Sequence, residues 1–204
     1  MANNRDFEVY KIGDVIPDFL ISSVGAFSCG NEELDRFLKE RACLYCRESL
    51  AATFLFLAER DGARAAAGYV SICNGSVSRK IFHNVHCNSN PVSNRRFQRT
   101  VLALIDESKY MQEYPATKIA RLAIDESFQR SGLGSVIVAY VRRIALENEC
   151  ASRFITVDAK TETGAYKFYR KLGFEYFVEA HEKEDFGDRE AVPMYLDLLR
   201  ESIQ

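Results

Sequence analysis

The chain has 204 residues, 47% of them hydrophobic, which is enough to bury a continuous core without disulfides and excludes a disordered or fibrous protein. Its 27 Lys and Arg against 29 Asp and Glu give a net charge of −2, which excludes a global positive field toward nucleic acid or membrane. Six irregularly spaced cysteines indicate reduced thiols, and no apolar run suits a signal core or a spanning helix. We therefore expect a single cytoplasmic domain over residues 1–204, with no membrane partner.

The first predicted elements are a helix and a hairpin. The helix begins after Asn31, which can cap it, and ends near Cys46 or Leu50. Two strands follow at 53–58 and 68–73, joined by a turn that predicts antiparallel pairing. A further helix is expected over 95–109.

The second half of the chain alternates strands and helices. A strand at 118–124 leads through a glycine-containing loop to an amphipathic helix that starts at Leu133. A strand at 153–158 precedes a helix from Ala165 that Gly173 can close. The last two strands are expected near 174–179 and 191–198. The pattern predicts a mixed α/β fold.

The loop between the strand and the Leu133 helix has the features of an anion site. Main-chain amides at a helix start point toward an anion, and Gly132 and Gly134 remove side chains that would block its approach. A tight turn without a ligand is the alternative reading. A dinucleotide site of an oxidoreductase fits poorly, because Ile137 stands where the third glycine belongs and seven residues separate Ile124 from Gly132.

Three motifs together resemble the GNAT superfamily of acyl-CoA-dependent N-acetyltransferases. Gln129-Arg130-Ser131-Gly132-Leu133-Gly134 matches the family's Gln/Arg-x-x-Gly-x-Gly/Ala signature, and residues 121–125 resemble the strand before it. Residues 165–174 resemble the family's Ala-x-x-Phe-Tyr-x-x-x-Gly-Phe. Residues 27–38 also resemble a subgroup that includes tRNA-acetylating toxins.

The resemblance implies a fold and a cosubstrate. The fold is a mixed, mostly antiparallel sheet of about six to seven strands with helices on both faces and a splay between two central parallel strands. Residues 118–177 would form the acetyl-CoA-binding core, and 75–115 a family-variable insertion. The implied cosubstrate-binding residues are Leu122, Ala123, Ile124, Gln129, Arg130, Ser131, Gly132, Leu133, Gly134, Ser135 and Tyr166.

The resemblance also implies roles. The diphosphate would lie on the amides from Arg130 to Ser135, the pantetheine would pair with the backbone of Leu122 to Ile124, and Tyr169 would be the catalytic acid for the leaving thiol. The Ile124 amide would stabilise the oxyanion. Tyr169 could instead be only a core residue. Asp125 and Glu126 lie near the proposed slot, and we expect each to be a solvated loop acid rather than the general base.

The implied reaction transfers acetyl from acetyl-CoA to a primary amine of a small molecule or peptide by direct attack in a ternary complex. Two alternatives stay open: a toxin-type enzyme acting on aminoacyl-tRNA, and a non-catalytic acyl-CoA-binding module. The basic cluster around Arg95 and Arg96 could contact tRNA or be an exposed helix face, and a homodimer is possible.

Two further patterns have ordinary explanations. Cys43, Cys46, His83 and His86 have spacings seen in zinc sites, but the cysteines already fit a helix, so we expect no metal. The acidic residues between 179 and 190 could attract a cationic amine, or simply form a solvated loop.

Overall fold

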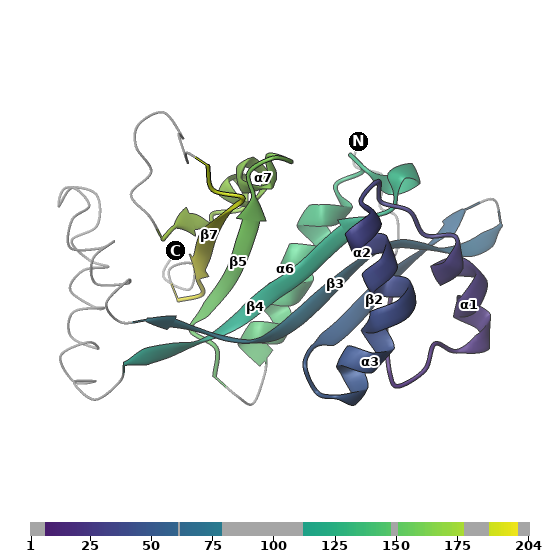
Figure 1. Ribbon diagram of the computed structural model, residues 1–204, viewed down its shortest axis with the longest axis horizontal. Coiled ribbons are helices and arrows are strands. Elements are labelled where there is room, and N and C mark those ends of the chain that lie inside the picture. Colours follow the sequence, from purple (N-terminus) through teal and green to yellow (C-terminus); the bar gives the residue numbers. More distant parts are fainter. Residues whose placement is uncertain (1–6, 61, 79–111, 148–150, 178–187, 200–204) are drawn as a thin grey trace. The chain divides into compact units, whose positions relative to one another are not determined.

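The computed structural model describes residues 7–60, 62–78, 112–147, 151–177 and 188–199 (Figure 1). The predicted helix at 95–109, the Arg95–Arg96 cluster, the histidine pair and most of the acidic loop lie outside these ranges. The chain divides into two compact units, which are described separately. The first contains Met1–Cys73 and Ile119–Arg143, and the second contains Asn74–Lys118 and Ile144–Gln204.

Within the described residues, seven strands are hydrogen-bonded in the order β1-β2-β3-β4-β5-β7-β6, with mostly antiparallel pairing and one parallel pair, β4 and β5. This confirms the predicted mixed sheet. Two of the strands, β3 and β4, are long and contribute residues to both units. The strand bounds are β1 Glu8–Lys11, β2 Ala52–Arg60, β3 Ala63–Ser78, β4 Glu113–Ile124, β5 Phe154–Lys160, β6 Glu175–Tyr176 and β7 Ala191–Asp197.

In the first unit, helices cover both faces of the strands (Figure 1). Alternate residues of β2 point to opposite faces. Leu55 and Leu57 belong to a buried cluster with α1 and the helical layer that follows it. Phe54 and Phe56 point the other way and contact Tyr140 of α6, with ring centroids 5.4 and 5.3 Å apart. The helix bounds are α1 Asp18–Gly25, α2 Glu32–Arg36, α3 Ala42–Arg47 and α6 Leu133–Glu147.

The predicted helix after Asn31 is present, and it contains one unpredicted irregular turn. The Asn31 side chain accepts a hydrogen bond from the Leu34 amide at 3.1 Å, as expected of an N-cap. Between α2 and α3 lies a π-helical turn, η1 (Phe37–Arg41), in which the Ala42 amide bonds to the Phe37 carbonyl. The extra residue in that turn rotates the aromatic side chains that follow it.

Gly68 in β3 allows α6 to pack closely on the strands of the first unit. A Cβ atom at this position would lie 2.9 Å from the Ala123 carbonyl oxygen and 3.2 Å from the methyl groups of both Leu133 and Ile137. The contact with the carbonyl oxygen is too short for a real Cβ, and the two methyl groups would have to shift by a few tenths of an ångström, so a side chain here would disturb the packing of the start of α6. The position of the loop that precedes α6 therefore depends on Gly68.

The second unit is built on an antiparallel pair, β5 and β7, with β6 on the outer side of β7. Helix α7, Ala165–Lys171, lies in this unit. Arg153, just before β5, and Asp197, at the end of β7, form a largely buried ion pair at 2.8 Å. Of the strand predicted at 174–179, the described residues 174–177 contain a strand at Glu175–Tyr176, and residues 178 and 179 lie outside the described ranges. Among the described residues, no helix is long and apolar enough to cross a membrane.

Candidate functional site

The loop between β4 and α6 has an unusual backbone. After the short 3₁₀ helix η2 (Glu126–Phe128), Arg130 has φ 58° and Gly132 has φ 88°. The left-handed conformation is easy for glycine but costs about 1 kcal/mol or more for an arginine. Left-handed residues alternating with right-handed ones turn successive main-chain N–H groups toward a common side, which creates an anion-binding concavity.

The amides of this loop are available to a ligand. Within the part of the chain that the structure describes, no group accepts a hydrogen bond from the amides of residues 130–134, whereas Ser135 and Val136 donate to the Gly132 carbonyl at 3.0 and 3.3 Å. A Cβ at Gly132 would meet nothing within 4 Å, so space is open beside it. A row of donors at the start of a fifteen-residue helix suits a diphosphate.

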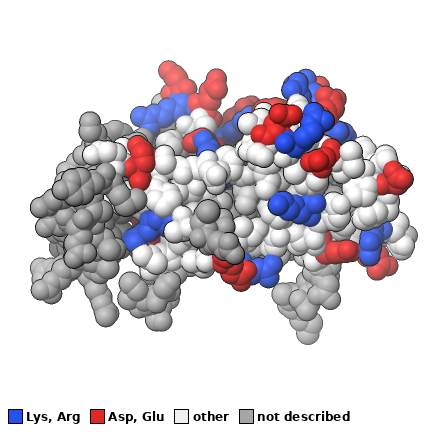
Figure 2. Space-filling view, turned by 90° about the horizontal axis from the view of Figure 1, so that it is seen from below, with Lys and Arg blue, Asp and Glu red and all other residues white. Residues whose placement is uncertain are grey.

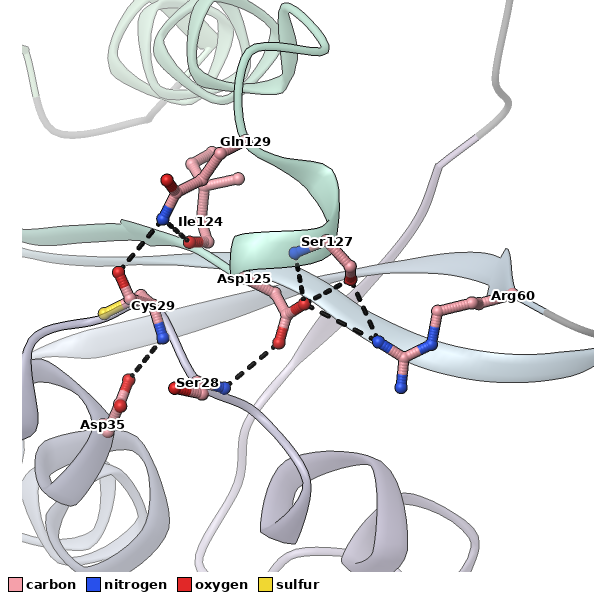
Figure 3. Close-up of polar contacts among 8 residues, drawn as sticks. All are labelled: Ser28, Cys29, Asp35, Arg60, Ile124, Asp125, Ser127 and Gln129. Carbon is pink, nitrogen blue, oxygen red and sulfur yellow. Dashed lines mark hydrogen bonds and ion pairs between the residues drawn. The ribbon is translucent and has the colours of Figure 1, made fainter.

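Two polar side chains of the motif hold the loop in place. Gln129 Nε2 donates to the carbonyl oxygens of Cys29 at 3.0 Å and Ile124 at 3.2 Å (Figure 3). Ser131 Oγ donates to the Phe128 carbonyl at 2.6 Å. These bonds occupy the Gln129 amide nitrogen and the Ser131 hydroxyl, so both side chains shape the loop, while the backbone offers the donors.

Asp125 is the centre of a hydrogen-bond network at the end of β4 (Figure 3). Its Oδ2 accepts from the Ser28 amide at 3.1 Å, and its Oδ1 accepts from the Ser127 amide at 3.1 Å and from the Ser127 hydroxyl. The Arg60 guanidinium lies 3.7 Å from Oδ1 and donates to the Ser127 hydroxyl at 3.0 Å. Only 6% of Asp125 is exposed.

The expectation that Asp125 is a solvated loop acid is therefore wrong. Sequence position suggested a loop, but the carboxylate caps η2 and receives an amide from a segment 97 residues away. Both of its oxygens accept hydrogen bonds from the protein, so the carboxylate holds the end of β4 and the Ser28 segment together. Glu126 is exposed, as expected.

The segment around Cys29 packs beside the end of β4, a contact that no local sequence pattern predicts. The Glu126 amide donates to the Ser28 carbonyl at 2.8 Å, and the Cys29 amide donates to Asp35 Oδ1 at 2.9 Å. Burial and the hydrogen bond with Asp35 raise the pKa of the Cys29 thiol to about 12. Cys29 is thus a neutral packing residue, not a nucleophile.

In the second unit, the Phe-Tyr-x-x-x-Gly-Phe motif forms the C-terminus of α7. Gly173 has φ 89°, its amide bonds to the Arg170 carbonyl, and the Phe174 amide bonds to the Tyr169 carbonyl at 3.1 Å. This is a Schellman motif, in which the chain reverses so that the residue after glycine contacts the last helical turn. The Phe174 ring accordingly lies 5.2 Å from the Tyr169 ring. The motif therefore fixes the orientation of Tyr169.

Tyr169 is 5% exposed, and burial raises its pKa above the ordinary value of 10.0. The phenol is therefore neutral over the physiological range and can act as a hydrogen-bond donor. Tyr166, one turn earlier, is partly exposed, and the Lys167 ammonium lies 5.6 Å from its ring centre. The resemblance assigns three residues to the pantetheine, and they are the last three residues of β4, in the first unit: Leu122, Ala123 and Ile124.

A family model described as "Acetyltransferase (GNAT) family" matches residues 25–174. The chain belongs to this family. The match includes the loop, α6, β5 and the Tyr169 motif, and it confirms the resemblance read from the sequence. The protein is thus a GNAT acetyltransferase.

Several solved structures share the fold over nearly the whole chain. AtaT complexed with acetyl-methionyl-tRNAfMet has a TM-score of 0.67 at 19% identity, covering 97% of this chain and 98% of that one. A tyrosine-to-phenylalanine mutant of KacT has a TM-score of 0.66 at 20% identity, covering 97% and 99%. The corresponding type of mutant of the AtaT toxin, bound to the C-terminus of the antitoxin AtaR and acetyl-CoA, has a TM-score of 0.65 at 19% identity, covering 98% and 99%. No curated protein sequence matches the chain.

The described residues hold no group of three or more His, Cys, Asp and Glu side chains placed to bind a metal ion. Cys43 and Cys46 lie in α3, and burial, followed by the nearby negative charges of Cys46 and Asp14, raises the pKa of the Cys43 thiol.

Proposed function

We propose that this chain transfers the acetyl group of acetyl-CoA to a primary amine in a ternary complex. The observation that carries the proposal is the row of main-chain amides at residues 130–134, held by left-handed Arg130 and Gly132 and lacking acceptors among the described residues. Such a row matches the charge and length of the diphosphate in coenzyme A. The Arg130 side chain, which is exposed, adds a guanidinium for a phosphate oxygen.

The remaining roles follow the family motif. The backbone of Leu122 to Ile124 would pair with the pantetheine, and Tyr166 would line the thiol end. The amine nitrogen attacks the thioester carbonyl carbon, so that the N–C bond forms and the C–S bond breaks. Tyr169 donates its phenolic proton to the departing sulfur and regains one from solvent, while the amine loses its proton to water. The Ile124 amide would stabilise the oxyanion.

The burial of Tyr169 has two opposing effects on this role. Its raised pKa keeps the phenol protonated before the reaction, as an acid must be. The same shift makes the phenol a weaker acid, so part of its effect would come from the hydrogen bond that it donates to the leaving sulfur before the proton is transferred. A carboxylic acid would already be ionised at neutral pH, which is why a tyrosine suits this position.

For the acceptor we propose the α-amino group of an aminoacyl-tRNA. The support is the likeness, over nearly the whole chain, to AtaT in complex with acetyl-methionyl-tRNAfMet, together with the resemblance of residues 27–38 to toxins of this kind. AtaT structures also contain the antitoxin AtaR, so a toxin role with a cognate antitoxin belongs to the same proposal. A cytoplasmic location and a homodimer are consistent with it.

The test is calorimetric titration with acetyl-CoA, followed by a turnover assay on aminoacyl-tRNA and a panel of simple amines. Gly134→Glu places bulk and negative charge against the diphosphate and should abolish acetyl-CoA binding. Glu8→Gln, an exposed change in β1 of the first unit, serves as the control. Acetyl-CoA binding without turnover of any amine would instead identify a non-catalytic binding module. Undiminished binding by Gly134→Glu would contradict the assigned diphosphate site.

A further inference from the structure

Arg121 in β4 is half-buried against aromatic side chains of the first unit. Its Cζ atom lies 3.9 Å from the centre of the Phe37 ring and 5.4 Å from that of Tyr45. The Phe37 ring lies nearly parallel to Tyr69, at 24° and 6.1 Å, and its own exposure is only 4%. The guanidinium is therefore held on a rigid aromatic stack.

No anionic partner neutralises this arginine within the described ranges. Its Nε atom is buried without a hydrogen-bond partner there, and no carboxylate forms an ion pair with it. The Tyr69 hydroxyl beside it donates instead to the Leu34 carbonyl at 2.8 Å. Arg153 offers a contrast: it also stacks on a ring, 5.5 Å from Phe154, but it is paired with Asp197. A charge withdrawn from water is unfavourable unless an anion joins it.

The backbone under the stack is also irregular. Phe37 is the first residue of the π-helical turn η1, and Tyr45 lies in the helix that follows. Turns of this kind occur often at functional sites, because they re-aim side chains at some cost in helix stability. Phe37, at the start of this turn, and Tyr45, after it, are the two rings that contact Arg121, and Tyr45 is partly exposed.

We propose that Arg121 binds a phosphate group of the RNA acceptor, with the partly exposed Tyr45 beside it available to a neighbouring base. This inference rests on the proposed function. In an aminoacyl-tRNA the carboxylate of the amino acid is esterified, so the negative charges of the acceptor are the phosphates of the RNA backbone. A guanidinium held flat offers two parallel N–H donors to phosphate oxygens. Acidic and basic side chains intermingle over the described part of the face drawn in Figure 2, so this part of the surface offers single cationic contacts rather than a continuous basic patch.

The experiment measures binding of fluorescently labelled, uncharged tRNA to the full chain by anisotropy over a range of salt concentrations. The test variant is Arg121→Gln. The matched control is Arg143→Gln, since Arg143 in α6 of the same unit also lies over a tyrosine ring, 5.1 Å from Tyr140, but is exposed. A second variant, Arg121→Lys, keeps the charge and loses the planar fork.

Arg121→Gln should weaken tRNA binding roughly 10- to 100-fold and reduce the slope of log affinity against log salt by about 0.7, the value of one single-strand phosphate contact. Arg121→Lys should keep the slope and bind several-fold more weakly than the wild type. Thermal unfolding and acetyl-CoA affinity should match those of Arg143→Gln.

Equal tRNA affinity of Arg121→Gln and Arg143→Gln would overturn the inference, as would loss of acetyl-CoA affinity in Arg121→Gln, because the phosphate bound would then belong to the cosubstrate. If Arg121→Gln does not fold, wild-type affinity in Arg121→Lys has the same meaning. Failure of the wild type to bind acetyl-CoA would refute the proposed function instead, and the anisotropy assay would still report on Arg121.

Discussion

Removing the Asp125 carboxylate should destabilise the protein and weaken acetyl-CoA binding. In Asp125→Ala, the partly buried Ser28 amide loses its acceptor, which costs about 1–3 kcal/mol, and η2 loses its cap, which costs about 1 kcal/mol. Arg60 adds under about 1 kcal/mol, because its side chain is 43% exposed. The expected loss is about 2–4 kcal/mol, or about 5–15 °C in Tm for a chain of this size.

The control for this variant is Asp158→Ala, which removes the same charge. Asp158 pairs with Lys118 at 2.7 Å, but the two side chains are 52% and 39% exposed, so its loss should cost less than about 1 kcal/mol. Both variants are compared by thermal unfolding and by titration with acetyl-CoA. Because the loop at 129–132 follows directly on the Asp125 network, only Asp125→Ala should bind acetyl-CoA more weakly.

Equal melting temperatures for the two variants would refute the reasoning, since they would mean that the Ser28 amide finds water at no cost. The Tm of Asp125→Asn gives a second test of the same reasoning. It keeps one acceptor oxygen but directs an NH₂ group at one of the donors, so its Tm should lie between that of the alanine variant and that of the wild type.

Three further outcomes are expected. Tyr169→Phe should lower kcat about 10²-fold or more with nearly unchanged acetyl-CoA affinity. Because burial raises the pKa of Tyr169, the wild-type rate should show no alkaline loss from this group below pH 10. An unchanged kcat in Tyr169→Phe would mean that Tyr169 is only a core residue. Gly68→Ala should destabilise by about 1–3 kcal/mol, because the new methyl group meets the Ala123 carbonyl, and calorimetry should show weaker acetyl-CoA binding. Iodoacetamide at pH 8 should modify Cys29 at least about a hundredfold more slowly in the native protein than in urea, as measured by mass spectrometry. Because the pKa of Cys29 is raised in the folded protein, the free energy of unfolding should fall as the pH rises above 9.0, where only the unfolded thiol ionises.

The elements that the sequence predicts well are those with strong local signals. Asn31 has the side chain of an N-cap, and the apolar stripe from Leu133 has an unbroken helical period, so both helices start where expected. The elements missed have weak local signals. β1 has four residues, and α1 follows Pro17 without a side-chain cap, so both depend on contacts with the rest of the first unit.

The candidate site divides in the same way. The diphosphate loop and the Tyr169 motif are short, contiguous patterns whose residue types follow from backbone conformation, as Gly132 and Gly173 show with φ of 88° and 89°. Asp125 is buried, and Arg121 stacks on aromatic rings, because of partners that lie far away along the chain. Nothing within a few residues of Asp125 indicates that an amide at Ser28 would reach it.

The glycine that is missing from the dinucleotide pattern illustrates why a local motif is incomplete by itself. In that pattern the third glycine lies in the helix and allows it to approach the strands. Here Ile137 occupies the helix position, and its methyl group lies 3.2 Å from the site of a Cβ at Gly68. The small residue is thus on β3 instead of on α6. The start of α6 can therefore pack closely on the strands. The position of the loop at 130–134 depends on this packing at Gly68, on the hydrogen bonds of Gln129 and on the Asp125 network.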